Sequence, residues 1–491
     1  MPDEADQPAS DLLAERRAKL ERLRAAGIEP FPYEFPDRTE IAELRAAHQG
    51  LAAGEETDSR YRVAGRIAAR RGHGRAAFID IADGSSRIQL HAREDLLGAE
   101  SFRRLVELDL GDLIGADGVV FATRRGELSL RLEDWTLLAK GLRPLPDKYH
   151  GLEDVELRYR HRELDLIANP EIRELFRKRA AVVAAVREWL DARGFLEVET
   201  PVLQPLYGGA LARPFMTHHN ALDRDLYLRI ATELYLKRCV VGGIDRVYEL
   251  GKDFRNEGIS HKHNPEFTML EWYEAYADYT DAAQRLEELV AHVARTVLGT
   301  TTIERDGTEI DLAPPWRRVS LEQAILERTG IDLAKRPSRE ELAAAMASEA
   351  DAAEGWGKLV DGLLSKLVEP ELRQPTFVLD YPVELSPFAK RHRSKPALVE
   401  RWEAFVGGTE IANAFTELND PDEQRRRFEQ QREELRRGDQ ETQPFDEAFL
   451  EALEYGMPPT AGVGLGIDRL VMILTGARSL REVLLFPALR S

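Results

Sequence analysis

The stretch Phe254–Tyr273, FRNEGISHKHNPEFTMLEWY, gives the strongest indication of the fold and the function of this chain. Its twenty residues carry an arginine, acidic side chains, two histidines and a lysine, and then turn aromatic. Because each buried charge needs a partner, such a density of polar groups is unfavourable in a folded core and indicates a ligand site. If residues 247–256 and 266–274 form paired strands, Arg255 and Glu257 share one face, because successive strand residues point to opposite sides.

The second half of this stretch adds a stacking surface to the charged first half. Phe267, Glu271 and Tyr273 share one face of the second expected strand. The loop between the strands, GISHKHNP, is basic, with two histidines and a lysine. A cation, a basic loop and an aromatic ring suit the phosphates and the purine of a nucleoside triphosphate. No GK[ST] triplet occurs in the chain, so the predicted nucleotide site is not a P-loop.

Composition indicates a multi-domain protein of a reducing compartment. A length of 491 residues predicts two or three domains, and 43% hydrophobic and 32% charged residues predict packed cores beneath a charged surface. The single cysteine, Cys239, excludes an intramolecular disulfide framework and is interpreted as a small buried residue. The N-terminus lacks an apolar signal segment, and the longest aliphatic run, Ala180–Val186, is too short to span a membrane. We therefore expect a cytoplasmic protein with no membrane association.

Charge is distributed unevenly along the chain. The net charge of -19 argues against a surface that is basic throughout. Residues Ser59–Ile79 nevertheless hold six arginines and no acid. A locally basic module on an acidic protein is what selective nucleic-acid binding requires, and a solvated arginine-rich face is an equally good interpretation of the charge alone.

The N-terminal part is expected to be two helices followed by a small barrel. Residues 11–26 and 39–53 read as helices. From Tyr61 onward, five short β-rich runs punctuated by glycine, aspartate and serine fit a five-stranded OB-type barrel, whose open face binds oligonucleotides. An aromatic residue on that face, such as Phe78, would stack a base or belong to the core. The proline-containing stretch Gly141–Asp154 reads as a linker.

The rest of the chain reads as α+β rather than as an alternating parallel sheet. A long helix is expected from Asn169 to about Gly194, followed by a strand at EVETPVL. Residues 221–280 read as strands broken by one helix, and residues 318–372 as mostly helical. Strands return at PTFVLDYP and EIANAFTEL, and the charged helix DEQRRRFEQQREELRRG is interpreted as a solvated face.

Two further clusters carry chemistry. In FVGGTEIANAFTELND, Asn413, Phe415 and Glu417 alternate on one face of a strand. Glu403 and Glu410 lie just upstream, and carboxylates near phosphates are natural Mg²⁺ ligands, although two acids seven residues apart are a weak signal.

The last cluster, PPTAGVGLGIDRLVMILTG, has glycines at 462, 464 and 466 before an apolar helix that opens with Asp468 and Arg469. Glycines let a ligand approach the backbone, and a helix N-terminus favours anions. A Rossmann interpretation of these glycines is weak, because no βαβ unit surrounds them.

These clusters resemble the three motifs of class II aminoacyl-tRNA synthetases. GFLEVETPVL is similar to motif 1, FRNEGISHKHNPEF to motif 2 and GLGIDRLVMIL to motif 3. A preceding OB barrel is typical of the subclass for aspartate, asparagine and lysine. Within it, GGALARPFMTHHNALDRDLYLRIATELYLKR, HNPEFTMLEWY, EIANAFTELND and MPPTAGVGLGIDRL resemble the bacterial lysyl-tRNA synthetases over about residues 60–490. Several motifs longer than ten residues carry this resemblance.

The resemblance implies a fold and an activity. It implies an N-terminal helical extension (1–58), an OB-fold anticodon-binding domain (59–143), a linker (144–168) and a catalytic domain (169–491) with an antiparallel sheet, flanking helices and a helical insertion around 318–372. It also implies a homodimer formed through motif 1. The implied enzyme is an ATP-dependent lysine–tRNA ligase that converts L-lysine and ATP to lysyl-adenylate and pyrophosphate, then transfers lysine to the 3′-terminal adenosine of tRNA(Lys), with Mg²⁺ as its cofactor.

The resemblance also implies site residues. Arg255 and Arg469 would be catalytic, Glu403 and Glu410 would bind the metal, and Arg71, Phe78 and Gln89 would read the anticodon. The implied ATP-binding residues are Arg255, Glu257, His263, Asn264, Phe267, Glu410 and Arg469. The implied lysine-binding residues are Gly209, Glu233, Arg255, Glu271, Tyr273, Asn413, Phe415 and Glu417. The acids in the second set agree with electrostatics, because a pocket for a cationic side chain should present carboxylates.

Two positions depart from the family pattern, and three alternatives remain. Thr232 stands where many relatives have proline, and Lys262 where some have arginine, which would turn a bidentate phosphate contact into a point charge.

One alternative is a synthetase for another amino acid of the same subclass, which would need a cationic pocket. The others are a paralogue that lysylates a protein, which would lack the barrel, and a non-enzymatic RNA-binding protein, which would be expected to lose residues such as Arg255 or Phe267.

Overall fold

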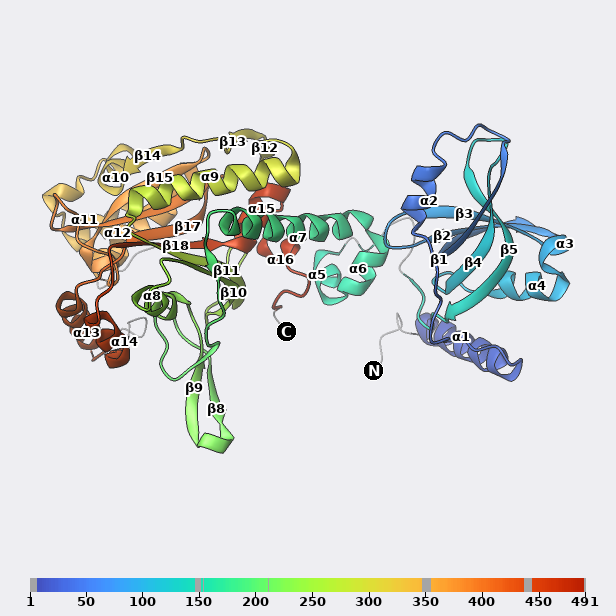
Figure 1. Ribbon diagram of the computed structural model, residues 1–491, viewed down its shortest axis with the longest axis horizontal. Helices are drawn as coiled ribbons and strands as arrows, with labels where there is room; N and C mark the ends of the chain where they lie inside the picture. The colour runs from blue at the N-terminus through green and yellow to red at the C-terminus, as the bar shows by residue number, and fades with distance from the viewer. Residues whose placement is uncertain are drawn as a thin grey trace. The chain divides into compact units, whose positions relative to one another are not determined.

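The computed structural model describes residues 7–145, 152, 154–210, 212–346, 355–436 and 444–489. The chain divides into two compact units, Met1–Gly151 and Leu152–Ser491 (Figure 1). Each unit has its own buried hydrophobic core. None of the helices in the described part of the chain combines the length and the apolar character that crossing a membrane requires.

The N-terminal unit is a closed barrel of five strands in the order β1-β2-β3-β5-β4, as the β-rich runs predict. The long strand β1 pairs with both β2 and β4 and contains a bulge between Ile67 and Ala69, which lets it bend around the barrel. The elements of the barrel are β1 (Glu56–His73), β2 (Ala76–Ala82), β3 (Arg87–Arg93), α3 (Glu94–Leu97), α4 (Ala99–Glu107), β4 (Leu113–Ala122) and β5 (Leu128–Ala139).

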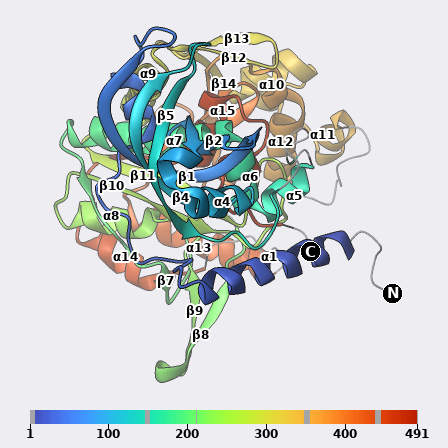
Figure 2. The same ribbon diagram turned by 90° about the vertical axis from the view of Figure 1, so that its right-hand side faces the viewer.

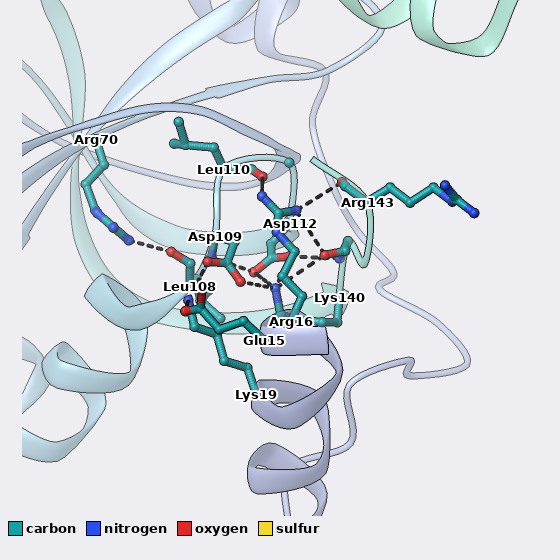
Figure 3. A network of polar contacts seen from close by, with 12 residues as sticks. Glu15, Arg16, Lys19, Arg70, Leu108, Asp109, Leu110, Asp112, Lys140 and Arg143 are labelled. Carbon is teal, nitrogen blue, oxygen red and sulfur yellow. Dashed lines mark hydrogen bonds and ion pairs between the residues drawn. The ribbon is translucent and has the colours of Figure 1, made fainter. Parts of the chain in front are cut away.

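Two helices precede the barrel, as expected. Helix α1 (Gln7–Ala25) begins somewhat earlier than the predicted helix, and α2 (Ile41–Ala47) is shorter than its prediction. Figures 1 and 2 show α1 outside the barrel. Its Arg16 holds it there: the guanidinium donates to the carbonyl oxygens of Gly141, Arg143 and Leu110 at 3.0–3.2 Å (Figure 3).

The C-terminal unit is built on an eight-stranded sheet in the order β14-β15-β16-β17-β18-β11-β10-β6. Neighbouring strands are antiparallel except at the two edges, where β14 is parallel to β15 and β6 to β10. The α+β prediction, with an antiparallel sheet, is therefore confirmed. The strands are β6 (Leu196–Glu197), β10 (Arg246–Phe254), β11 (Glu266–Ala275), β14 (Arg317–Ser320), β15 (Thr376–Pro382), β16 (Leu398–Val406), β17 (Thr409–Thr416) and β18 (Thr460–Gly466).

Three helices cover one face of this sheet and make its main core. In Figure 1, α7 (Pro170–Asp191) and α9 (Tyr279–Leu298) run side by side along the sheet, with α15 (Ile467–Thr475) next to α7. Strand alternation sorts the side chains: Leu270 and Trp272 of β11 belong to this core, whereas Glu271 and Tyr273 point to the other face. The sheet therefore has one apolar face that packs and one polar face that is available for a site.

The remaining elements surround the other face and the edges. The β8–β9 hairpin extends away from the rest of its unit in both views (Figures 1 and 2). The region predicted as a linker includes two short helices, α5 and α6. These remaining elements are α5 (Val155–Arg160), α6 (Arg162–Ala168), β7 (Leu203–Gln204), β8 (Met216–His219), β9 (Arg224–Leu228), α8 (Glu233–Val241), β12 (Thr302–Arg305), β13 (Thr308–Asp311), α10 (Leu321–Thr329), α11 (Arg339–Ala345), α12 (Trp356–Leu363), α13 (Pro421–Arg436), α14 (Glu447–Glu454) and α16 (Leu480–Val483).

Three local predictions differ from the structure. EVETPVL is not one strand: β6 and β7 are two-residue strands in different sheets. Strand β16 was not predicted, because it carries charged residues whose partners lie elsewhere in the chain, as when Arg401 donates to Asn413 and to the carbonyl oxygen of Leu385. Helix α13 is not a fully solvated face: Phe428 is buried, and the buried Arg427 donates to the carbonyl oxygens of Ser386 and Ala389 at 2.9 and 2.6 Å.

Candidate active site

A cavity of about 640 Å³ lies over the polar face of the sheet. Strands β11, β16, β17 and β18, the loop between β10 and β11, and the starts of α8 and α15 contribute to its lining. Every residue of the C-terminal unit for which the sequence suggested a role in ATP, lysine or metal binding lines it. These residues are Gly209, Glu233, Arg255, Glu257, His263, Asn264, Phe267, Glu271, Tyr273, Glu403, Glu410, Asn413, Phe415, Glu417 and Arg469.

Two cross-strand rows form the floor of the cavity. On neighbouring strands β17, β18 and β11, Asn413 pairs with Gly464, which pairs with Glu271. Two residues further along, Phe415 pairs with Gly462, which pairs with Tyr273. Because residues two apart on a strand share a face, the glycines of β18 leave a strip without side chains between two strands whose side chains line the cavity. These glycines belong to a strand and not to a phosphate-binding loop.

The closed end of the cavity is acidic. Glu271 accepts hydrogen bonds from the backbone N–H of Thr232 at 3.1 Å and from the hydroxyl of Tyr273 at 3.2 Å. Glu417 is buried at the end of β17, and its Oε1 has no hydrogen-bond partner among the described residues. Glu233 is buried in the first turn of α8. Three carboxylates from three separate segments therefore converge on one buried space.

Burial changes the protonation of these acids. Burial, together with the neighbouring charges of Asp253 and Glu233, raises the pKa of Glu271 to about 8 against the opposing effect of the Thr232 hydrogen bond. Burial also raises the pKa of Glu417 to about 8 against the opposing attraction of Lys237. The pKa of Glu233 is raised by burial as well. Because the charged forms of these buried acids are poorly hydrated, a cationic ligand that pairs with them would stabilise them strongly.

Two glycines allow the backbone to come close to these acids. A Cβ atom on Gly462 would lie 2.0 Å from Oε1 of Glu417 and 2.4 Å from Cε1 of Tyr273. Gly209 has φ +89°, and a Cβ there would lie 3.0 Å from Cβ of Glu233. Neither position has room for a larger residue without moving a carboxylate-bearing side chain.

The other part of the cavity suits a nucleotide. The guanidinium of Arg255 lies 5.0 Å from the centroid of the Phe267 ring, and its buried Nε has no hydrogen-bond partner among the described residues. His263 is held by Ser260, with 2.9 Å between Nδ1 and the hydroxyl oxygen. Burial, followed by the charge of Arg469, lowers the pKa of His263. The histidine is therefore a neutral hydrogen-bonding group rather than a cation at neutral pH.

The loop before β11 is less basic in effect than its sequence predicted. Lys262 is paired with Glu369, with 2.5 Å between Nζ and Oε1. Asn264 is tied to the backbone: its Oδ1 accepts from the N–H of Ala488 at 3.1 Å. Of the predicted cluster of basic side chains, one is therefore paired with an acid and His263 is neutral.

Two carboxylates from neighbouring strands meet two arginines beside the nucleotide part. Glu403 on β16 accepts a hydrogen bond from Arg401 at 2.5 Å, and Glu410 on β17 accepts one from Arg469 at 2.8 Å. Burial raises the pKa of Glu403 to about 7, with Arg401 opposing and Glu410 adding to the rise. For Glu410, burial is outweighed by Arg469, and the pKa is lowered. Two acids that repel one another beside a polar cavity are a donor set that fits a hard divalent cation.

Two residues in this site escaped the sequence interpretation. Lys237 bridges Glu233 and Glu417; its i, i+4 spacing from Glu233 on an expected helix was the one available signal. Arg401 donates to Asn413 at 3.0 Å and to Glu403, so it connects the two parts of the cavity. It lies on β16, the strand that the sequence did not reveal.

The three predicted anticodon residues lie on adjacent strands of the barrel. Phe78 on β2 pairs with Arg71 on β1 and with His91 on β3. The rings of Phe78 and His91 are stacked, with centroids 4.7 Å apart and planes inclined by 11°. Gln89 lies two residues before His91 on β3 and accepts a hydrogen bond from Ser129 at 3.2 Å. This face combines a stacking surface with an exposed arginine and an amide.

Comparisons with known proteins match both units of the chain. The family model described as tRNA synthetases class II (D, K and N) matches residues 154–490, and that described as OB-fold nucleic acid binding domain matches residues 61–138. The chain is 52% identical over 491 residues to a lysine–tRNA ligase of Pelotomaculum thermopropionicum, covering 99% of this chain and 96% of the relative. It is 53% identical over 486 residues to a lysine–tRNA ligase of Synechococcus sp. strain CC9311, covering 98% and 99%.

Proposed function

Since the chain belongs to the class II aminoacyl-tRNA synthetases and groups there with the lysine–tRNA ligases, we propose how its cavity activates L-lysine with ATP and passes it to tRNA(Lys). The observation that carries this proposal is the convergence of Glu233, Glu271 and Glu417 at the closed end of the cavity. A site for aspartate or asparagine would not need three buried acids there.

The substrate lysine has two ammonium groups, and the closed end offers acceptors for both. Glu417 and Tyr273 bind the ε-ammonium, and the unpartnered Oε1 of Glu417 is an acceptor already buried for it. Glu233 and the backbone at Gly209 bind the α-ammonium. Glu271 adds the third negative charge, while Asn413 and Phe415 shape the wall around the aliphatic chain. The lysine carboxylate is then directed toward Arg255.

In the first step, an oxygen of the lysine carboxylate forms a bond to the α-phosphorus of ATP as the bond to the pyrophosphate oxygen breaks. Such a reaction depends on positioning and charge neutralisation more than on a covalent catalyst. Arg255 holds the lysine carboxylate and the α-phosphate together. Phe267 and Arg469 stack on the two faces of the adenine, with Glu257 and Asn264 beside the nucleotide and His263 toward the γ-phosphate.

Mg²⁺ fits the donors that this cavity presents. Glu403 and Glu410 would hold it, and it would supply positive charge to the phosphates when bound. The mutual repulsion of the two acids, which contributes to the raised pKa of Glu403, is what a divalent cation would relieve.

In the second step, the 3′-hydroxyl of the tRNA terminal adenosine gives up its proton as its oxygen forms a bond to the carbonyl carbon of the adenylate, and AMP leaves with the electron pair of the broken bond. The tRNA is read by the barrel, where Phe78 stacks an anticodon base and Gln89 and Arg71 contact it.

We assign residues 1–58 as the helical extension, 59–143 as the anticodon-binding domain, 144–168 as the linker and 169–491 as the catalytic domain. A homodimer through motif 1 and a cytoplasmic location complete the proposal.

Aminoacylation of tRNA tests this function directly. Purified protein, ATP, Mg²⁺ and labelled L-lysine should produce acid-precipitable lysyl-tRNA from a tRNA(Lys) transcript and much less from tRNA(Asp). Charging of tRNA(Asp) with aspartate, or no charging by folded protein that still exchanges pyrophosphate with lysine, would contradict it.

A further inference from the structure

A lysine of the protein itself sits among the acids of the lysine-binding end. Lys237, on α8, is fully buried. Its Nζ lies 2.6 Å from Oε1 of Glu233 and 2.5 Å from Oε2 of Glu417, and 5.1 Å from the centroid of the Phe388 ring. The cation thus connects the first turn of α8 with the end of β17, the two segments that carry the carboxylates proposed to bind the two ammonium groups of the substrate.

Each of these carboxylates gives one oxygen to Lys237 and turns the other toward the cavity. Oε2 of Glu233 lies 3.7 Å from the position of a Cβ on Gly209, and Oε1 of Glu417 lies 2.0 Å from that of a Cβ on Gly462. Both glycines line the cavity. Lys237 therefore fixes the rotation of both carboxyl groups, so that one acceptor oxygen of each faces the place where the substrate binds.

Lys237 also sets the net charge of the closed end of the cavity. Glu233, Glu271 and Glu417 carry three negative charges when ionised, and Lys237 compensates one of them. Two negative charges then remain for the two ammonium groups of a bound lysine. Burial opposes the charge on Lys237, but the two carboxylates outweigh it, and its pKa is raised.

We propose that Lys237 is a positioning residue for the amino-acid substrate, which orients Glu233 and Glu417 and sets the net charge of the pocket to match the two ammonium groups of lysine. This inference rests on the proposed lysine site. Lys237 acts through the two glutamates and remains bound to them when the substrate is present.

A buried lysine in the barrel shows what a purely structural ion pair looks like. Lys140 bridges Asp109 and Asp112 at 2.6 and 2.8 Å (Figure 3). There, every carboxylate oxygen has a partner within the N-terminal unit: Asp109 also binds Lys19, and Asp112 accepts from the backbone N–H groups of Asp109 and Gly141. Around Lys237, by contrast, Oε1 of Glu417 has no hydrogen-bond partner among the described residues.

The test compares Lys237→Met with Lys140→Met, which removes a buried cation from the unit that does not contain the cavity. Pyrophosphate exchange by the full-length Lys237→Met variant should show a lysine KM raised at least about tenfold, because truncating one member of a buried charge network disrupts its partners. The KM for ATP should change by less than about threefold on the same scale. Lys140→Met should leave the lysine KM unchanged even if it lowers the melting temperature.

Three outcomes would overturn the inference: an unchanged lysine KM in folded Lys237→Met, a lysine KM that rises no more than the ATP KM, or the same loss in Lys140→Met. If Lys237→Met does not fold, a crystal structure of the wild-type protein with bound L-lysine decides instead. Lys237 should still contact both glutamates, and its displacement by the substrate ammonium would refute the proposal. Wild-type exchange with lysine is measured alongside, so failure of the lysine site itself is recognised separately.

Discussion

Glu271 and Gly464 lie directly opposite one another on β11 and β18. On the far side of Gly464 is Asn413 of β17, so the glycine separates two polar side chains on the floor of the cavity. A Cβ on Gly464 would find no atom closer than 3.8 Å. The nearby Gly462 is different, because Glu417 and Tyr273 occupy the space that its side chain would need. Two glycines of one strand thus differ in what surrounds them: Gly464 leaves open space in the cavity, and Gly462 leaves space for Glu417, the acid that we propose binds the ligand.

Gly462→Ala should disturb both the protein and its lysine site. Forcing a methyl group against Glu417 and Tyr273 is expected to destabilise the catalytic unit by about 1–3 kcal/mol, as overpacking does. The lysine KM in pyrophosphate exchange should rise with it. In Gly464→Ala the melting temperature should stay near that of the wild type, while the lysine KM rises because the methyl group projects into the ligand space. Equal melting temperatures for the two variants would contradict this assignment.

Lysine binding should release protons and strengthen as the pH rises toward 8. The raised pKa values of Glu271 and Glu417, both about 8, mean that these acids are protonated in part at neutral pH without ligand. An ammonium ligand favours their charged forms, so the affinity should increase by up to about tenfold per pH unit for each proton released. Calorimetry at pH 7 in two buffers of different ionisation enthalpy measures this release. Heats that are independent of the buffer would contradict the prediction.

The same two acids should make the ligand-free protein less stable as the pH rises. Their folded-state pKa values, about 8, lie above the ordinary value of 4.5, so the folded state binds protons more tightly than the unfolded state. Their contribution to the free energy of unfolding is therefore complete below pH 4.5 and is lost between pH 4.5 and about 8. Added lysine should recover melting temperature most strongly at the upper end of this window.

Phe267→Leu should weaken ATP binding selectively. Stacking of a base on an aromatic ring contributes about 1–3 kcal/mol, so the ATP KM should rise roughly five- to hundredfold. The lysine KM in the same variant is the internal control, because Phe267 lies at the nucleotide part of the cavity beside Arg255. A rise confined to lysine would place the two ligands the other way round.

Glu403→Gln and Glu410→Gln should each raise the Mg²⁺ concentration needed for half-maximal pyrophosphate exchange by at least about tenfold. Even substitution of residues that only support a metal's ligands lowers metal affinity or activity by about that factor. Chelation of Mg²⁺ should abolish exchange by the wild type. The matched control is Glu400→Gln: Glu400 lies on the same strand as Glu403 and is buried, but it pairs with Arg393 and Thr416 and does not line the cavity. A similar Mg²⁺ shift in this control would argue against a metal on Glu403.

Phe78→Ala should separate the two half-reactions. The ring of Phe78 stacks on His91 at one face of the barrel, in the unit that does not contain the cavity. Lysine-dependent pyrophosphate exchange should therefore be unchanged, while the KM for tRNA(Lys) rises roughly five- to hundredfold through loss of one base stack. Unchanged aminoacylation would remove Phe78 from the anticodon site.

Sequence reasoning predicted best where function depends on alternation along a strand. The face shared by Phe267, Glu271 and Tyr273 needs only the period of two, and the structure places all three at the cavity. The five barrel strands were recognisable for a related reason, since short β-rich runs were separated by turn residues.

What escaped prediction depends on partners distant in sequence. Charged β16 is buried because Arg401 finds acceptors on β17 and in the segment before β16, and no local pattern shows this. Helix α13 looked solvated because its sequence is highly charged. The carbonyl oxygens that accept hydrogen bonds from Arg427 lie in a different segment, at Ser386 and Ala389. The proposed role of Lys237 depends on Glu417, which lies in another motif and is brought next to it only by the tertiary fold.

The most direct test of the central claim is ATP–pyrophosphate exchange measured with lysine, aspartate and asparagine in turn, without tRNA and with Mg²⁺ present. The acidic end of the cavity predicts exchange with lysine and none above background with the other two. Exchange with aspartate or asparagine instead of lysine would contradict the assignment of Glu233, Glu271 and Glu417 as the acceptors of the two ammonium groups.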